Sequence, residues 1–261
     1  MKIPKKSLGQ NFLIDKNIVS KIIDLINIAD RDIIEIGPGR GALTDKILER
    51  KPKTLNLIEK DYNLTKYLKE KYSGINNINI FNADILKFNL KDICKKNSAI
   101  IGNLPYNISS QIFVKISKLN QWPPKFNDVI FMFQKELGEK IVAKYSDQNY
   151  GRISVLTNYR YNIVKKFTVS ATCFRPKPKV TSIVIHFKPK QNNSYNIKKI
   201  ENLEKITNIF FSNKRKMINK NFKKIFSNAE AKNFPEIKLN SRPSEIKPYT
   251  YFKITEFFEK K

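Results

Sequence analysis

Asp32-Ile33-Ile34-Glu35-Ile36-Gly37-Pro38-Gly39-Arg40-Gly41 is the stretch of sequence from which the fold can be predicted. Its first half is a short apolar run, typical of a strand buried inside a sheet. Three glycines at alternate positions follow, and helical spacing of apolar residues resumes at Leu43, Ile47 and Leu48. Glycines between a strand and a helix let the backbone approach a ligand closely, and a helix N-terminus favours polar or anionic groups. The stretch therefore predicts an α/β fold with a ligand site at this turn.

Apolar runs and helical spacing continue to alternate along the chain. The further strands that they predict are 54–58, 78–81, 99–101 and 128–133. The predicted helices are 15–26, with Asp15 as N-cap, and 62–72, 136–144 and 152–158. This alternation favours a mostly parallel, doubly wound sheet. Two later runs, 161–169 and 179–187, are predicted to pair antiparallel at one edge of it.

The pattern changes after Phe187. Residues 188–196 are polar and contain a proline, which is typical of a linker, and helical spacing dominates from Ile197 onward. We therefore predict two domains, an α/β domain over 1–190 and a small all-helical domain over 196–261.

The charge balance indicates a polyanionic partner. The 261 residues include 50 Lys and Arg against 23 Asp and Glu, a formal net charge of +27. Lysines and arginines displace counterions from phosphates, so nucleic acid is the partner that this excess favours. A compositional bias toward Lys, Asn and Ile also contributes to the count. Six basic residues of the tail are candidate phosphate contacts as a group, namely Lys214, Arg215, Lys216, Lys220, Lys223 and Lys224.

Several function classes are disfavoured by what the sequence contains. Cys94 and Cys173 have no metal or redox spacing, and the single histidine, His186, cannot supply a metal cluster. His186 lies in an alternating run and is predicted to be a structural strand residue. We therefore predict no metal site. No apolar run reaches transmembrane length, and the basic N-terminus lacks the apolar region of a signal peptide. The expectation is a cytoplasmic protein with no membrane partner.

Two carboxylates end the strands that follow the glycine turn. Glu59 ends the second strand, where a carboxylate can accept both hydroxyls of a ribose, and Asp84 follows the third. A nicotinamide nucleotide and S-adenosylmethionine both satisfy these features. The spacing G-x-G-x-G lacks the third glycine of the dinucleotide fingerprint, and Asp84 could accept from an adenine amino group. Both observations favour S-adenosylmethionine, against the alternative that Glu59 and Asp84 merely cap helices.

The stretch Asn103-Leu104-Pro105-Tyr106 follows the apolar run 99–101 and precedes a helical pattern starting near Ile108. The amide oxygen of Asn103 and a backbone carbonyl can accept the two hydrogens of an exocyclic amine, and the ring of Tyr106 can stack on a base. An ordinary strand-to-helix turn, in which Asn and Pro are common, is the alternative.

Taken together, these residues resemble the small-subunit (16S) ribosomal RNA adenine N6,N6-dimethyltransferase family over nearly the whole chain. Each motif alone is weak, but their common order along the chain is specific. In order, the motifs are Ser7-Leu8-Gly9-Gln10-Asn11-Phe12-Leu13, Glu35-Ile36-Gly37-Pro38-Gly39, Glu59-Lys60-Asp61, Asn82-Ala83-Asp84, Asn103-Leu104-Pro105-Tyr106, Phe133-Gln134-Lys135-Glu136, Tyr150-Gly151-Arg152-Ile153-Ser154-Val155 and Phe174-Arg175-Pro176-Lys177-Pro178-Lys179-Val180-Thr181-Ser182.

The resemblance implies a class I S-adenosylmethionine-dependent methyltransferase fold, with catalysis in 1–190 and RNA binding in the helical domain 196–261. It implies dimethylation of two adjacent adenosines in a hairpin loop near the 3′ end of 16S rRNA, within a small ribosomal subunit or its precursor, by a monomer. One departure is Arg40, where a leucine is more usual. By motif match, the residues that bind the methyl donor are Gln10, Asn11, Leu13, Gly37, Gly39, Glu59, Lys60, Asp84, Ile85 and Asn103. The residues implied at the target adenine are Asn103, Leu104, Pro105 and Tyr106, with Phe174 facing the base opposite Tyr106.

Three alternatives stay open at this point. A 23S-type ribosomal RNA adenine methyltransferase shares the fold, the donor and much of the Asn103–Tyr106 motif, although Leu104 and Phe174-Arg175-Pro176 favour the small-subunit branch. A family member could act mainly as a nucleic-acid-binding factor, but the intact Asn103–Tyr106 motif argues for catalysis. An unrelated nicotinamide-dependent enzyme is the remaining alternative.

Overall fold

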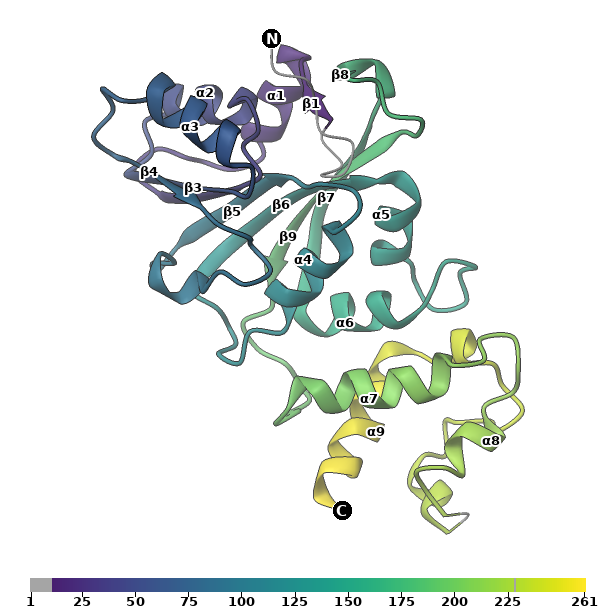
Figure 1. Ribbon diagram of the computed structural model, residues 1–261. Helices are drawn as coiled ribbons and strands as arrows, with labels where there is room; N and C mark the ends of the chain where they lie inside the picture. The colour runs from purple at the N-terminus through teal and green to yellow at the C-terminus, as the bar shows by residue number, and fades with distance from the viewer. Residues whose placement is uncertain (1–10, 228) are drawn as a thin grey trace. The chain divides into compact units, whose positions relative to one another are not determined.

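The computed structural model describes residues 11–227 and 229–261, and these divide into two compact units (Figure 1). The first unit is Met1–Lys115, Pro124–Gly138 and Ile163–Pro189. The second unit is Ile116–Pro123, Glu139–Asn162 and Lys190–Lys261. The second unit thus takes in segments that the sequence assigned to the first domain, because α6 (Arg152–Arg160) packs against α7 (Ile200–Phe211) and α9 (Pro248–Lys260).

A twisted sheet forms the centre of the first unit, and its strands follow the order β4-β3-β2-β5-β6-β9-β7 (Figure 1). The strands are β2 (Asp32–Ile36), β3 (Thr54–Glu59), β4 (Ile78–Asn82), β5 (Ser98–Asn103), β6 (Phe126–Gln134), β7 (Tyr161–Val169) and β9 (Ser182–Pro189). From β4 to β6 all neighbours pair in parallel, and β9 is antiparallel to β6. The predicted doubly wound α/β sheet is confirmed, and so is the placement of the two late strands side by side at one edge.

The elements of the first unit form where apolar spacing and caps predict them. All five residues of β2 are buried, as the apolar run requires. Asp15 caps α1 (Lys16–Ile23) by accepting hydrogen bonds from the backbone N–H of Asn17 and Ile18, at 2.9 and 3.0 Å. The other helices that begin in this unit are α2 (Ala42–Glu49), α3 (Tyr62–Lys71), α4 (Ser109–Ser117) and α5 (Lys135–Val142). The two-residue strands β1 (Phe12–Leu13) and β8 (Phe174–Arg175) pair antiparallel apart from the main sheet.

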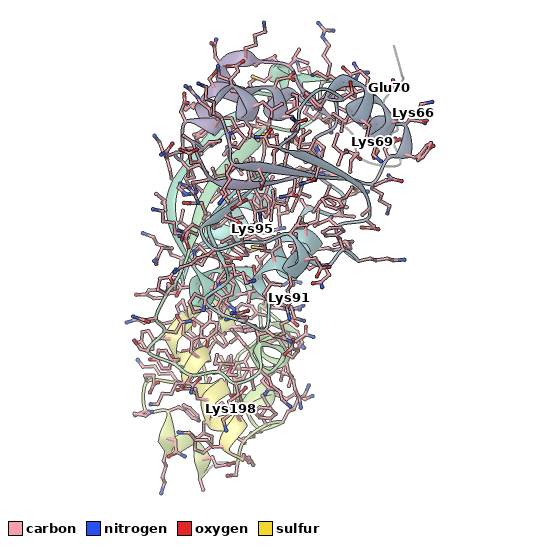
Figure 2. All side chains as sticks on the ribbon, turned by 90° about the vertical axis from the view of Figure 1, so that its left-hand side faces the viewer. Lys66, Lys69, Glu70, Lys91, Lys95 and Lys198 are labelled. Atoms are coloured by element: carbon pink, nitrogen blue, oxygen red, sulfur yellow. The ribbon has the colours of Figure 1, made fainter. Side chains whose placement is uncertain are left out.

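Basic side chains cover much of the exposed surface. Figure 2 shows Lys66 and Lys69 beside Glu70 on α3, and Lys91 and Lys95 on the connection that precedes β5. All five side chains belong to exposed residues. These four lysines present part of the positive excess counted in the sequence to solvent on this unit.

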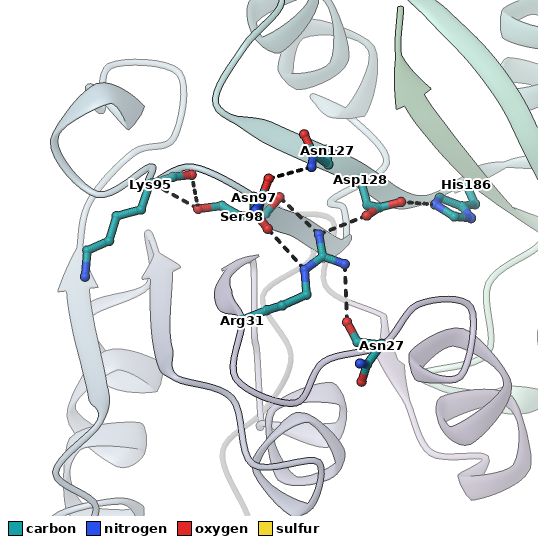
Figure 3. Close-up of polar contacts among 8 residues, drawn as sticks. All are labelled: Asn27, Arg31, Lys95, Asn97, Ser98, Asn127, Asp128 and His186. Atoms are coloured by element: carbon teal, nitrogen blue, oxygen red, sulfur yellow. Dashed lines mark hydrogen bonds and ion pairs between the residues drawn. The ribbon is translucent and has the colours of Figure 1, made fainter. Parts of the chain in front are cut away.

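A buried ion-pair network ties the amino-terminal ends of the strands together (Figure 3). Asp128 on β6 accepts a hydrogen bond from Arg31 at 2.9 Å and pairs with His186 Nε2 on β9 at 2.7 Å. Arg31 also donates to the backbone carbonyls of Asn97, Asn27 and Ser98. His186 is 3% exposed, so its predicted structural role is confirmed.

The second unit is helical, as the apolar spacing predicts. Besides α6, α7 and α9 it contains α8 (Asn219–Phe222) and short 3-10 turns. Aromatic rings fill its core, with Phe210 in edge contact with Tyr251 at 5.6 Å and with Phe222 at 6.4 Å. Over residues 11–227 and 229–261, no helix combines the length and apolar content needed to cross a membrane.

Candidate active site

A cavity of about 460 Å³ opens at the carboxyl ends of β2, β3 and β5 in the first unit. This is the edge of an open α/β sheet at which ligands bind. The turn after β2, the acidic end of β3 and the loop after β5 all contribute to its walls. Polar groups from three strands therefore converge on one enclosed space.

The glycine turn after β2 brings backbone close to the cavity. Gly37 and Gly39 have φ angles of 68° and 59°, a conformation that glycine adopts without a steric penalty. A Cβ atom on Gly37 would lie 3.6 Å from the carbonyl oxygen of Asn103, and one on Gly39 would lie 3.0 Å from the ring of Phe12. The positive φ of both residues favours glycine, and a side chain on Gly39 would also crowd the Phe12 ring at the cavity wall.

Glu59 ends β3 and is held by backbone hydrogen bonds. Its Oε1 accepts from the N–H of Asp61 at 2.8 Å, and its Oε2 accepts from the N–H of Gly39 at 3.2 Å. Burial raises the pKa of Glu59, and the two N–H groups act in the opposite direction by stabilising the carboxylate. The carboxylate is thus fixed in one orientation at the cavity wall, where it can accept further hydrogen bonds from ligand hydroxyls.

Asp84 follows β4 and lies beside Lys60. Its Oδ2 pairs with Lys60 Nζ at 2.8 Å, and its Oδ1 accepts from the backbone N–H of Leu86 at 2.9 Å. The hydrogen bond from Lys60 lowers the pKa of Asp84, with a further contribution from the Leu86 N–H. Asp84 is therefore ionised at neutral pH and can accept hydrogen bonds from a ligand in the cavity.

Asn103 is the last residue of β5, and its side chain is held by the N-terminal segment. The amide Nδ2 donates to the backbone carbonyl of Asn11 at 3.0 Å. A carbonyl oxygen can only accept, so this contact determines which end of the amide is nitrogen. The side-chain oxygen of Asn103 is left as an acceptor at the wall of the cavity.

The loop after Asn103 presents one aromatic ring to the cavity. Tyr106 is half-buried, and its hydroxyl shares a hydrogen bond of 2.5 Å with the Oγ of Ser182. Phe174 does not face it: Phe174 is 1% exposed, lies in the core opposite Leu13 in the β1–β8 pair, and lines no part of the cavity. The predicted sandwich of a base between Tyr106 and Phe174 is therefore not formed in this structure, and Arg175 lines the cavity instead.

Most of the predicted site residues meet at this one cavity. Those that line it are Asn11, Leu13, Gly37, Gly39, Glu59, Lys60, Asp84, Ile85, Asn103, Leu104, Pro105 and Tyr106. Gln10 lies outside the residues that the structure describes.

A buried carboxyl group in the wall was not predicted as a site residue. Glu35 is 1% exposed within β2, and its Oε2 accepts a hydrogen bond from Thr44 at 2.7 Å. Burial raises the pKa of Glu35 to about 8, although the hydrogen bond from Thr44 acts to lower it. The sequence did contain a signal for this residue, because an acidic side chain in the middle of an apolar strand is unusual. Arg40 also lines the cavity, with its guanidinium 4.6 Å from the centre of the Phe12 ring.

Comparisons with known proteins give a consistent result. The family model described as Ribosomal RNA adenine dimethylase matches residues 1–260. The chain is 43% identical to the Ribosomal RNA small subunit methyltransferase A of Pelagibacter ubique (strain HTCC1062), over 98% of this chain and 97% of that protein. Among solved structures, a dimethyladenosine transferase from Plasmodium falciparum superposes with a TM-score of 0.76 at 26% identity, over 95% of this chain and 98% of that one. The 23S rRNA methyltransferase ErmE shares the fold, with a TM-score of 0.69 at 22% identity, over 95% of this chain and 100% of that one.

Proposed function

Because this chain belongs to the ribosomal RNA adenine dimethylase family, we propose that it dimethylates the N6 amines of two adjacent adenosines in a hairpin loop near the 3′ end of 16S rRNA. The methyl donor is S-adenosylmethionine, and the substrate is the small ribosomal subunit or its precursor. We assign donor binding and catalysis to 1–190 and RNA binding to the helical domain 196–261, in a cytoplasmic monomer. The observation that carries the proposal is that Asn103, which lines the cavity, donates through Nδ2 to the Asn11 carbonyl, so that its side-chain oxygen is left as an acceptor.

The donor fits the groups present at the cavity. Glu59 is positioned for the two hydroxyls of a ribose, Asp84 for an adenine amino group, and the Gly37–Gly39 turn for close approach of the methionine end. When bound, the donor supplies an electrophilic methyl group on a sulfonium, which leaves as the neutral thioether. The chain's own residues must therefore position and polarise the amine rather than activate the donor.

Asn103 and its loop position the target amine. The N6 lone pair of adenine is conjugated with the ring, so the amine is a poor nucleophile. The Asn103 side-chain oxygen accepts one amine hydrogen, and a backbone carbonyl accepts the other, which draws the nitrogen toward tetrahedral geometry. Pro105 O already accepts the N–H of Ile108 at 3.1 Å, so we assign the second acceptor to the carbonyl of Leu104. The lone pair is thereby directed at the methyl carbon, and the amine proton becomes acidic as the new bond forms.

Tyr106 supports the base from one face. Its ring is half-buried, and its hydroxyl is tied to Ser182, which is itself fully buried. A fixed ring can stack on a splayed base for about 1–3 kcal/mol. The second methylation needs only the Asn103 acceptor, because the monomethylated amine keeps one hydrogen, which the Asn103 oxygen accepts.

Primer extension on small-subunit RNA from cells that lack this protein tests the proposal. We expect a double stop near the 3′ end of the RNA to disappear and to return when the wild-type chain is supplied. Purified protein should also incorporate labelled methyl groups into small-subunit RNA. Retention of the double stop, or incorporation into large-subunit RNA alone, would contradict the proposal and favour the 23S-type activity.

A further inference from the structure

The second unit contains a cavity of its own, separate from the candidate active site. It has a volume of about 720 Å³. Aromatic rings and cations dominate its lining, among them Trp122, Tyr159, Arg160, Tyr195, Lys198 and Lys199. Figure 2 shows Lys198 at the surface of this unit. The combination of rings, amides and cations is chemically suited to a nucleic-acid ligand.

Arg160 is the central cation of this cavity. It is the last residue of α6 and is 7% exposed. Its Nε donates to the backbone carbonyl of Ser117 at 2.9 Å, and its guanidinium lies 4.3 Å from the centre of the Trp122 ring. The Trp122 ring is fixed in turn, because its Nε1 donates to the carbonyl of Lys190 at 3.0 Å and Tyr161 packs edge-on at 5.3 Å. The guanidinium therefore has a defined plane and direction.

The two terminal nitrogens of Arg160 are available to a ligand. Within residues 11–227 and 229–261, neither makes a hydrogen bond, and no carboxylate lies within ion-pair distance of the guanidinium. Neither is an unpaired atom fully shielded from solvent, and Arg160 lines the cavity. A largely buried guanidinium thus keeps four N–H donors with no partner among the described residues, beside a polar cavity.

The electrostatics of the cavity favour an anion. Burial lowers the pKa of Arg160 because it penalises the charge, and an anionic ligand would compensate for that loss of hydration. Glu201 also lines the cavity, lies 3.9 Å from Lys118 and partly offsets the effect of burial on the Arg160 pKa, but the three cations of the lining outnumber it. The start of α7 is not the anion site, because Glu259 already accepts the backbone N–H groups of Lys198 and Lys199.

We propose that this cavity binds a phosphodiester of the RNA substrate, with the terminal nitrogens of Arg160 donating to two phosphate oxygens. A planar guanidinium matches a phosphate in this bidentate manner, which a lysine ammonium cannot reproduce. The exposed lysines Lys198 and Lys199 add long-range attraction at the entrance. This inference rests on the proposed function, which identifies the polyanion as RNA. It adds a binding site for the RNA phosphate backbone in the second unit.

The chain carries its own reporter for this cavity, since Trp122 is its single tryptophan. We would titrate the full chain first with inorganic phosphate and then with an oligoribonucleotide of the small-subunit hairpin, following tryptophan fluorescence. Both ligands are expected to change the Trp122 emission. Arg160→Gln should abolish the response to phosphate, weaken RNA binding about tenfold, and reduce the slope of log affinity against log salt by about one.

Three further variants separate ligand binding from damage to the fold. Lys238→Gln removes an exposed lysine of the same unit outside the cavity and should leave the Trp122 response unchanged. Arg160→Lys keeps the positive charge but cannot donate two parallel hydrogen bonds, so it should bind phosphate more weakly than the wild type. The double substitution of Lys198 and Lys199 by Gln alters only exposed side chains and should weaken RNA binding by itself.

The outcomes distinguish this inference from the proposed function. The phosphate site would be overturned if phosphate and RNA left the Trp122 emission unchanged, or if folded Arg160→Gln bound RNA as tightly as the wild type. Normal methyl incorporation in the same experiments would show that the proposed activity still holds. A response to poly-glutamate but not to the oligoribonucleotide would also overturn it, in favour of an acidic protein partner. If the Trp122 response is observed but the protein methylates no small-subunit RNA, the phosphate site is supported and the proposed activity is refuted.

Discussion

Replacing Asn103 by alanine separates catalysis from folding at this site. The change removes the side-chain oxygen that we assign to the target amine and the 3.0 Å hydrogen bond from Nδ2 to Asn11 O. Removing one preorganised polar group at a reacting centre costs about 10²–10³-fold in kcat, or roughly 3–4 kcal/mol. The lost hydrogen bond costs about 1 kcal/mol of stability. Activity should therefore fall by at least two orders of magnitude in a protein that still folds.

Methyl incorporation into small-subunit RNA at saturating donor measures this loss, and thermal unfolding measures the stability. Asn63→Ala is the matched control, because Asn63 is an exposed asparagine of the same unit that does not line the cavity, and we expect its turnover to stay within about threefold of wild type. Calorimetric titration should show that Asn103→Ala still binds the donor, because Glu59 and Asp84 are untouched, although the affinity should fall by the contribution of the Asn103 contact. Turnover of Asn103→Ala equal to that of the control would refute the role of the amide.

Asn103→Asp tests whether orientation matters beyond the presence of an acceptor. It keeps an acceptor oxygen but places a second oxygen where Nδ2 now donates, opposite the Asn11 carbonyl. Two acceptors cannot share a hydrogen, so the carboxylate should turn away and activity should be lost as in the alanine variant. An active aspartate variant would show that the contact with Asn11 is dispensable.

Three further substitutions test other carboxyl groups of the same unit. Glu59→Gln exchanges a charged acceptor for a neutral amide, so donor affinity in calorimetric titration should fall at least about tenfold while RNA affinity is retained; equal donor affinity would exclude the ribose role. Burial raises the Glu35 pKa from 4.5 to about 8, so the native state keeps a proton that the unfolded state loses, and stability falls as pH rises between these values. Urea unfolding of Glu35→Gln should show a flatter pH dependence, and an unchanged slope would contradict the assignment. Burial opposes ionisation of Asp128, yet hydrogen bonds from His186 and Arg31 lower its pKa, so its contribution is present at neutral pH and is lost as acid protonates the native carboxylate. Asp128→Asn should cost about 2–3 kcal/mol in neutral urea unfolding, and a loss below about 0.5 kcal/mol would show that the network is not stabilising.

The central strands of the sheet could be predicted because they are buried on both faces. A fully buried strand is a continuous apolar run, as in 33–34 and 99–101, and its periodicity is readable without tertiary information. The strands β1 and β8 were not predictable. They are two residues long, and Phe12 pairs with Arg175 from the other end of the first unit, so neither leaves a periodic pattern.

The site could be predicted where topology alone determines position. Glu59, Asp84 and Asn103 end or follow parallel strands, and the carboxyl ends of such strands meet at one edge. What the sequence does not contain is the environment of each side chain. Phe174 was expected to face the target base opposite Tyr106 because its motif resembles that of the family, but pairing with Leu13 turns its ring into the core. The hydrogen bond that orients Asn103 joins residues 92 positions apart, so it could not be predicted from the sequence either.

The location of the single histidine bears on how the amine loses its proton. His186 lies with Asp128 and Arg31 near the amino-terminal ends of the strands, whereas the cavity lies at their carboxyl ends. No histidine is therefore present at the site to act as a base. Glu35 and Glu59 line the cavity, but burial raises the pKa of Glu35 to about 8, so Glu35 is largely protonated at neutral pH, and the Glu59 carboxylate is already engaged by two N–H groups. Because N-methylation itself acidifies the amine, acceptor groups and solvent are sufficient, and the chemistry depends on how rigidly Asn103 is held rather than on a basic residue.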